Sequence, residues 1–131
     1  MMRPRYSPLG HGLLTGSLKA RDDIPQVLRA YPRFSEENFP VNLELVKEVE
    51  KLAAKKGCTP GQLAINWVRC LSKKPGMPPI IPIPGGSSKA RVEENAKIVD
   101  LSFEEMADID AVLAKLEIKG DRYPPGIPIN T

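Results

Sequence analysis

The sequence predicts an α/β chain that is mainly helical and contains two short parallel strands. Three patterns lead to this prediction. Apolar residues recur at helical spacing in several segments, and two capping-box sequences mark where helices begin. A run of isoleucines, Ile80-Ile81-Pro82-Ile83, is bounded by prolines and glycines, as a short buried strand would be. With 131 residues, 41% of them hydrophobic and 27% charged, the chain is long enough for one domain with its own core.

The composition argues against several classes of function. The net charge is +3, but lysine and arginine alternate with acidic residues along the predicted helices, so we expect no nucleic-acid partner. Cys58 and Cys70 lack CxxC spacing and the chain has one histidine, which argues against a zinc site. Free thiols suit a reducing cytosol, and we find neither a membrane-length apolar run nor a signal segment. We therefore expect a cytoplasmic protein without a membrane partner.

The first 40 residues are mostly loop. Residues 1–18 contain hardly any strand before a stretch with three glycines, which, together with Ser7 and Thr15, either cradles a ligand or forms a mobile surface turn. His11 in that stretch is either close to a ligand or simply exposed. Residues 19–40 form a polar excursion with a weak helical piece, and such a segment serves either as a functional lid or as a flexible insertion.

Two helices follow. From Asn42 to Lys56 the apolar residues fall on one helical face, and Gly57 is expected to end that helix. Thr59 then begins a capping box, with proline in the first helical position and Gln62 three residues on. The predicted buried stripe of this second helix is Leu63, Ala64, Trp67, Val68 and Leu71. Trp67 is therefore expected in the core rather than stacked on a ligand.

The isoleucine run predicts a strand that is covered on both faces. Pro82 and Pro84 remove hydrogen-bond donors from it, which suits the end of a sheet or the mouth of a barrel. Two more helices are predicted after it. The inner face of the first is Val92, Ala96 and Val99, and Ser102 caps a second one that continues through Met106, Ile109, Leu113 and Leu116. Residues 117–131 form a proline-rich tail that is extended or disordered.

The segment after the isoleucine run has features of a phosphate-binding site. Gly85 and Gly86 let the backbone turn sharply and approach a ligand, and Ser87 or Ser88 can cap the following helix. Cationic residues, Lys89 and Arg91, lie in the first helical turn, where acids are normally favoured, and this suggests an anionic guest. An ordinary strand-to-helix connection explains the same residues about equally well.

Three stretches in this order resemble the C-terminal part of aldo-keto reductases, in the branch of fungal and bacterial pyridoxal-reductase-like and aryl-alcohol-dehydrogenase-like enzymes. They are Tyr6-Ser7-Pro8-Leu9-Gly10-His11-Gly12-Leu13-Leu14-Thr15-Gly16, then Asn38-Phe39 with Cys58-Thr59-Pro60-Gly61-Gln62-Leu63-Ala64-Ile65-Asn66-Trp67-Val68, then Ile81-Pro82-Ile83-Pro84-Gly85 running to Glu93-Glu94-Asn95. Asp121-Arg122-Tyr123-Pro124 fits the resemblance too. It covers nearly all of residues 1–131.

The resemblance implies an incomplete C-terminal portion of a TIM-type (β/α)8 barrel that begins at the end of the seventh strand. It also implies an NADP-dependent oxidoreductase that acts on a small aldehyde or ketone in its full-length context. The implied cofactor contacts are Ser7, Leu9 and Gly10 at the pyrophosphate, with His11 and Gly12 in the adjacent loop; Gly85 and Gly86 through their backbone; Ser87, Ser88, Lys89 and Arg91 at the 2′-phosphate; and Glu94 and Asn95 at the adenine.

The chain departs from the family pattern at two places. Relatives often carry a basic pair where this chain has Ser87 and Ser88, so recognition of the 2′-phosphate would fall to Lys89 and Arg91. In the family, the catalytic Asp, Tyr, Lys and His tetrad lies in the part of the barrel that precedes these motifs, and no position here matches it. Tyr6 belongs to the Tyr-Ser-Pro-Leu-Gly motif and is not the catalytic tyrosine, so we predict no catalytic residue. Two hypotheses follow. The chain is the cofactor-binding part of a reductase, inactive alone, or it is a truncated remnant or a non-catalytic helical module that binds a partner through apolar helix faces.

Overall fold

The computed structural model describes residues 2–127. Its strands and α-helices are β1 (Arg3–Tyr6), α1 (Asn38–Lys56), α2 (Pro60–Cys70), β2 (Ile80–Ile83), α3 (Lys89–Ala96) and α4 (Phe103–Lys115). The two strands pair in parallel, with Arg3 opposite Ile80 and Tyr6 opposite Ile83. The prediction of a mainly helical chain with two short parallel strands is therefore confirmed.

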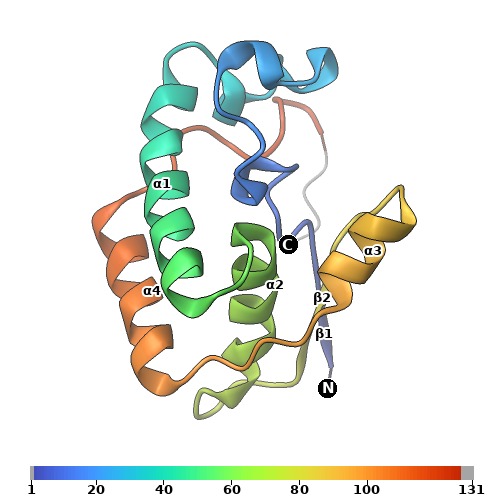
Figure 1. Cartoon of the computed structure of the whole chain (residues 1–131). Coiled ribbons are helices and arrows are strands. Elements are labelled where there is room, and N and C mark those ends of the chain that lie inside the picture. The colour runs from blue at the N-terminus through green and yellow to red at the C-terminus, as the bar shows by residue number, and fades with distance from the viewer. Residues whose placement is uncertain (1, 128–131) are drawn as a thin grey trace.

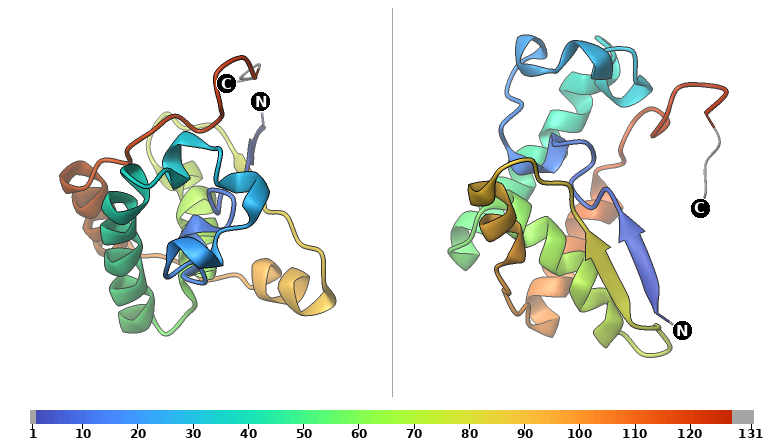
Figure 2. Two further views of the ribbon diagram at one scale, coloured as in Figure 1. Left: turned by 90° about the horizontal axis from the view of Figure 1, so that it is seen from above. Right: turned by 90° about the vertical axis from the view of Figure 1, so that its right-hand side faces the viewer.

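Helix α2 occupies the centre of the molecule (Figure 1). It packs against α1 on one side and against β2 on the other, while α4 lies beside α1 on the outside. Helix α3 stands apart from α1 and α4, as Figure 1 and the left view of Figure 2 show, and contacts α2. Because the strands are parallel, their carboxyl ends lie at the same edge of the sheet, and the loops that follow them start side by side.

The main core fills the space between α1, α2 and α4. Its buried residues are Leu45, Val49, Ala53, Leu63, Cys70, Leu101, Met106 and Ile109. A second cluster lies between α1 and the excursion of residues 19–40, where Ile24 and Phe34 are buried among their neighbours. That excursion is made of short 3₁₀ turns at Arg21–Asp23, Gln26–Leu28 and Pro32–Phe34. The excursion therefore packs against α1 through Ile24 and Phe34.

The predicted helix ends are largely confirmed. Gly57 ends α1 with a left-handed φ of 80°, and the Thr59 capping box opens α2, with the Gln62 N–H donating to Thr59 Oγ1 at 3.2 Å. Ser102 caps α4 in the same way. The predicted start of α1 at Asn42 is wrong, because the helix begins at Asn38. Pro40 falls in its first turn, where a backbone N–H has no helical partner to lose.

The expectation that β2 is covered on both faces is wrong. Ile80 is buried, but Ile81 is 46% exposed and Ile83 is 50% exposed. Successive side chains of a strand point to opposite faces, and only the face toward α2 is covered by described residues. The expected stripe on α2 is also only partly buried, because Trp67, Val68 and Leu71 are half-buried.

The predicted inner face of α3 is wrong for Val92 and Ala96, whereas Val99 packs against the main core from beyond the end of the helix. Val92 is 53% exposed, Ala96 is exposed, and the helix has no buried residue. Two buried amides of α2 hold this region instead: Gln62 Nε2 donates to the Glu94 carbonyl at 3.2 Å, and Asn66 Nδ2 donates to the Lys97 carbonyl at 3.0 Å. In α4, Leu113 is likewise exposed rather than buried.

The described part of the tail, residues 117–127, contains no helix or strand and runs back across the molecule. Asn42 of α1 fixes its beginning, since Asn42 Oδ1 accepts from the Lys119 N–H at 2.8 Å and its Nδ2 donates to the Lys119 carbonyl at 2.9 Å. The remainder of the predicted tail, residues 128–131, lies outside the described residues. None of the helices within residues 2–127 has the length and apolar character that a membrane crossing requires.

Candidate functional site

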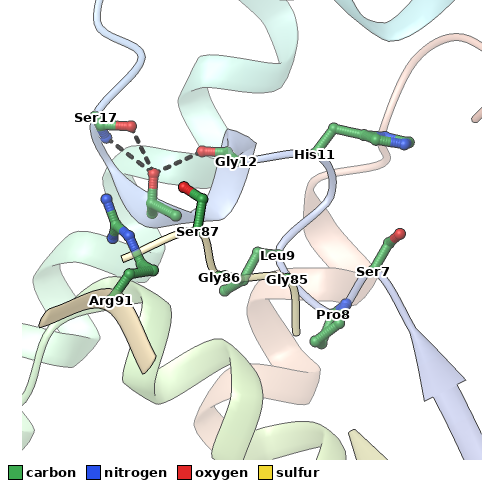
Figure 3. Close-up of a pocket in the computed structure, with 11 residues that line it drawn as sticks. Ser7, Pro8, Leu9, His11, Gly12, Ser17, Gly85, Gly86, Ser87 and Arg91 are labelled. Carbon is green, nitrogen blue, oxygen red and sulfur yellow. Dashed lines mark hydrogen bonds between the residues drawn. The ribbon is translucent and has the colours of Figure 1, made fainter. Parts of the chain in front are cut away.

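An open pocket of about 540 Å³ lies where the loop after β1 meets the loop after β2 (Figure 3). Its lining residues are Ser7, Pro8, Leu9, His11, Gly12, Thr15, Ser17, Gly85, Gly86, Ser87 and Arg91. Seven of the eleven lining residues are glycine or bear a hydroxyl group, and Arg91 is the one permanently charged side chain of the lining within the described residues. Such a surface suits an anionic, oxygen-rich guest.

The loop after β1, residues 7–12, is tightly turned, and we call it the pocket loop. Ser7 and His11 have left-handed φ values of 49° and 57°, which side chains other than glycine rarely adopt. Turn hydrogen bonds close it, from the Gly10 N–H to the Ser7 carbonyl and from the Gly12 N–H to the Leu9 carbonyl, each 3.1 Å long.

The short turn after the pocket loop adds hydroxyl groups to the same wall. Thr15 Oγ1 donates to the Gly12 carbonyl at 2.7 Å and lies 2.7 Å from Ser17 Oγ, with which it shares a hydrogen bond (Figure 3). The Ser17 N–H also donates to Thr15 Oγ1, at 3.3 Å. These bonds fix the two hydroxyl groups at the pocket.

The loop after β2 is held against α3. Asn95 Nδ2 donates to the Gly85 carbonyl at 3.1 Å, and a side chain at Gly86 would come within 3.2 Å of a Val92 methyl group. Ser88 caps α3, because its Oγ accepts from the Arg91 N–H at 3.2 Å. Glycine at position 86 therefore allows the close packing of the loop on the helix.

Arg91 is held by a chain of polar contacts that begins at α2. Thr59 Oγ1 donates to Glu94 Oε1 at 3.0 Å, and Glu94 Oε2 accepts from Arg91 Nη1 at 3.1 Å. Thr59 is also the N-cap of α2, so the same hydroxyl group caps one helix and orients a carboxylate on another. This chain sets the direction of the guanidinium at the pocket.

The structure brings six of the predicted site residues together in the pocket lining: Ser7, Leu9, Gly85, Gly86, Ser87 and Arg91. Gly10, Ser88, Lys89, Glu94 and Asn95 do not line it. Ser88, Glu94 and Asn95 support its walls through the contacts above, and the Lys89 side chain is 90% exposed with its Nζ 3.7 Å from Glu93 Oε1. Pro8 and Ser17 line the pocket without having been predicted. In the sequence, the pattern Thr15-Gly16-Ser17, two hydroxyl residues around a glycine, could have indicated Ser17 as a lining residue.

His11 lies between two tyrosine rings. Its ring centroid is 5.3 Å from that of Tyr31 and 5.5 Å from that of Tyr123, both edge to face. Burial lowers the pKa of His11 below its ordinary value, and the charges of Arg122 and Arg33 lower it further. Neutral imidazole is therefore favoured in the folded chain. Within residues 2–127, no group of three or more His, Cys, Asp or Glu side chains is arranged to hold a metal ion.

Comparison with known proteins agrees with this architecture. The model of the aldo/keto reductase family matches residues 5–114. An NADP(+) aldo-keto reductase of Schizosaccharomyces pombe, yakc, is 42% identical over 125 residues, which cover 92% of this chain and 35% of the relative. The aldo-keto reductase str7 of Strobilurus tenacellus is 39% identical over 121 residues, covering 89% of this chain and 34% of the relative. A Saccharomyces cerevisiae protein provisionally named a pyridoxal reductase is 40% identical over 129 residues, covering 90% and 37%.

The chain thus spans about a third of the length of these curated relatives. The family match covers well over half of the chain, including both loops that form the pocket. The chain belongs to the aldo/keto reductase family.

Proposed function

We propose that this chain is the cofactor-binding part of an NADP-dependent aldo-keto reductase, which transfers hydride between a nicotinamide and the carbonyl carbon of a small aldehyde or ketone. One observation carries the proposal: the loops after two parallel strands form a single pocket, lined with hydroxyl and backbone groups and with one arginine. Ligand sites of α/β folds lie at the carboxyl ends of such strands.

The donors in the pocket match the phosphate groups of NADP. The Ser87 hydroxyl has no hydrogen-bond partner in the described part of the chain and is free to meet an anion. Arg91 enters from the first turn of α3 and would bind the 2′-phosphate, with Ser7 and Leu9 at the pyrophosphate. Lys89 points into solvent, so we assign recognition of the 2′-phosphate to Arg91 rather than to both cations.

The barrel itself is part of the proposal. We place β1 and β2 as the seventh and eighth strands of a (β/α)8 barrel, in which the exposed side chains of Ile81 and Ile83 would face the interior. The family's catalytic tetrad would come from other strands of that barrel. We therefore expect residues 1–131 alone to bind cofactor without reducing a carbonyl group, because they include no proton donor beside the nicotinamide.

Titration of the purified chain with NADPH and NADH, followed by calorimetry, tests the assignment. A charge-assisted bond that is partly exposed to solvent is worth roughly 1.4 kcal/mol, so Arg91→Ala should weaken NADPH binding about tenfold and leave NADH binding nearly unchanged. Added salt should weaken the preference for NADPH, since the contact lies near the surface.

Lys89→Ala is the matched control. Lys89 lies two residues before Arg91 on the same helix, but its side chain does not line the pocket. The Lys89→Ala substitution should therefore leave the affinity for both cofactors unchanged. Equal losses for NADPH and NADH in Arg91→Ala would show that Arg91 supports the fold instead of contacting the 2′-phosphate. If the wild-type chain bound neither cofactor, the proposed function would be wrong for this chain.

A further inference from the structure

We propose that Arg122, in the C-terminal segment formed by residues 117–127, is a positioning residue that holds the pocket loop in the conformation that binds cofactor. The inference rests on the proposed function and adds a second requirement for cofactor binding, distant in sequence from both loops of the pocket. Arg122 belongs to the Asp121-Arg122-Tyr123-Pro124 stretch, to which the proposed function gives no role. Arg122 itself does not line the pocket.

The Arg122 side chain binds backbone carbonyls at the start of the pocket loop. Its Nη2 donates to the Tyr6 carbonyl at 2.9 Å and to the Ser7 carbonyl at 3.2 Å, across 116 and 115 residues of sequence. These carbonyls belong to the peptide units on either side of the Cα of Ser7, the left-handed residue that follows β1 and begins the turn. One nitrogen atom thus binds both sides of the point at which the chain changes direction.

The guanidinium group is fixed in place by aromatic rings as well. Its central carbon lies 4.4 Å from the centre of the Tyr6 ring and 5.9 Å from that of Tyr123. Arg122 Nε is buried and has no hydrogen-bond partner among the described residues, so its burial costs free energy that the carbonyl bonds and ring contacts must offset. A lysine has no planar group with which to reproduce this arrangement.

The same segment supports the second strained residue of the pocket loop. His11, with its left-handed φ of 57°, lies against the ring of Tyr123, the neighbour of Arg122. Left-handed conformations of residues other than glycine persist only where the surroundings hold them. The C-terminal segment contacts both left-handed residues of the pocket loop: Arg122 bonds the Ser7 carbonyl, and the Tyr123 ring lies against His11.

The segment is in turn anchored to the core. The side-chain amide of Asn42 holds the Lys119 backbone through two hydrogen bonds, and Gly120 lies so close to Pro32 that a Cβ added at Gly120 would come within 2.7 Å of the Pro32 carbonyl carbon. The C-terminal segment is therefore bound to α1 through Lys119 and to the pocket loop through Arg122. This loop would contact the pyrophosphate, which NADPH and NADH share, so loosening it must weaken both cofactors alike.

Arg122→Lys tests the proposal, since it keeps the charge and removes the planar group. We expect dissociation constants for NADPH and NADH to rise together, each about tenfold for the loss of a charge-assisted bond, with the ratio between them unchanged. The Gly10 and Gly12 amides, whose turn bonds close the loop, should exchange hydrogen for deuterium faster, while the Val99 amide should not change. Arg122→Ala should show the same pattern more strongly.

Arg29→Lys is the matched control, because Arg29 also donates to two backbone carbonyls, those of Ile24 and Asp22, away from the pocket. It should leave both dissociation constants and the exchange at Gly10 and Gly12 unchanged. Unaltered exchange and affinity in Arg122→Lys would overturn the proposal, as would a loss confined to NADPH, which would make Arg122 a contact of the 2′-phosphate. If wild-type protein bound neither cofactor, the proposed function would fail, and the exchange measurement would still decide whether Arg122 holds the loop.

Discussion

Asn66→Ala should be among the most destabilising single substitutions in this chain. The Asn66 side chain is buried in α2 and joins that helix to the chain leaving α3. Its Nδ2 donates to the Lys97 carbonyl at 3.0 Å and its Oδ1 accepts from the Val99 N–H at 3.1 Å. Its Oδ1 also accepts from Arg69 Nε at 3.0 Å. Because α3 buries no side chain of its own, these bonds are a large part of what attaches it to the core.

The size of the effect follows from the bonds that are lost. Each hydrogen bond contributes about 1 kcal/mol net, and leaving a buried backbone group unpaired costs at least as much. We therefore expect Asn66→Ala to lower the free energy of unfolding by about 3 kcal/mol, roughly a hundredfold in the unfolding equilibrium. Asn95→Ala is the control, because the Asn95 amide makes one exposed bond, to the Gly85 carbonyl, and its loss should cost about 1 kcal/mol or less.

Urea unfolding followed by the fluorescence of Trp67, the single tryptophan of the chain, measures both variants. With a denaturant slope of about 1–3 kcal/mol per molar, the midpoint for Asn66→Ala should fall by roughly 1–3 M. If Asn66→Ala lost no more stability than Asn95→Ala, the view that buried amides of α2 hold α3 would be refuted.

Three further predictions concern the tail, a helix cap and the histidine. Gly120→Ala should destabilise the chain far more than Gly126→Ala in thermal melts, because both have left-handed φ values but only Gly120 lies against backbone atoms. Thr59→Ala should lower the stability of the fold by about 1 kcal/mol or more in urea unfolding, since it removes the cap of α2, whereas Thr59→Ser should retain most of it. The pKa of His11 is lowered in the folded chain, so the folded state binds fewer protons, and stability should decline as the pH falls below about 6.5. His11→Gln should abolish that decline in unfolding measurements at pH 7.5 and 5.5.

Features set by neighbouring residues could be predicted from the sequence. The caps at Thr59 and Ser102 and the end of α1 at Gly57 depend on contacts within a few residues, and the structure has all three. The burial of α3 could not be predicted in this way. Apolar spacing suggested Val92 and Ala96 as its inner face, yet long-range hydrogen bonds from Gln62 and Asn66 determine which way the helix lies. Periodicity carries no information about polar anchors of this kind.

In the candidate site, too, local features could be predicted from the sequence and long-range contacts could not. The glycine-rich loops after the strands were predicted to come together at a ligand, and the structure places both in one pocket. Which of the two cations on α3 enters the pocket was not predictable, because this depends on how α3 is turned against the rest of the chain. The contacts of Arg122 join residues more than 100 positions apart, and no local pattern indicates them.

The central claim is that the loops after β1 and β2 bind NADP together. The most direct test is a titration of the isotope-labelled chain with NADP⁺, followed by nuclear magnetic resonance of the backbone amides. We predict that the amides of Ser7–Ser17, apart from Pro8, and of Gly85–Arg91 shift together along one saturation curve. We also predict that 5′-AMP, which lacks the 2′-phosphate, leaves the Arg91 amide nearly unmoved. Shifts confined to one of the two loops, or located elsewhere in the chain, would contradict the claim.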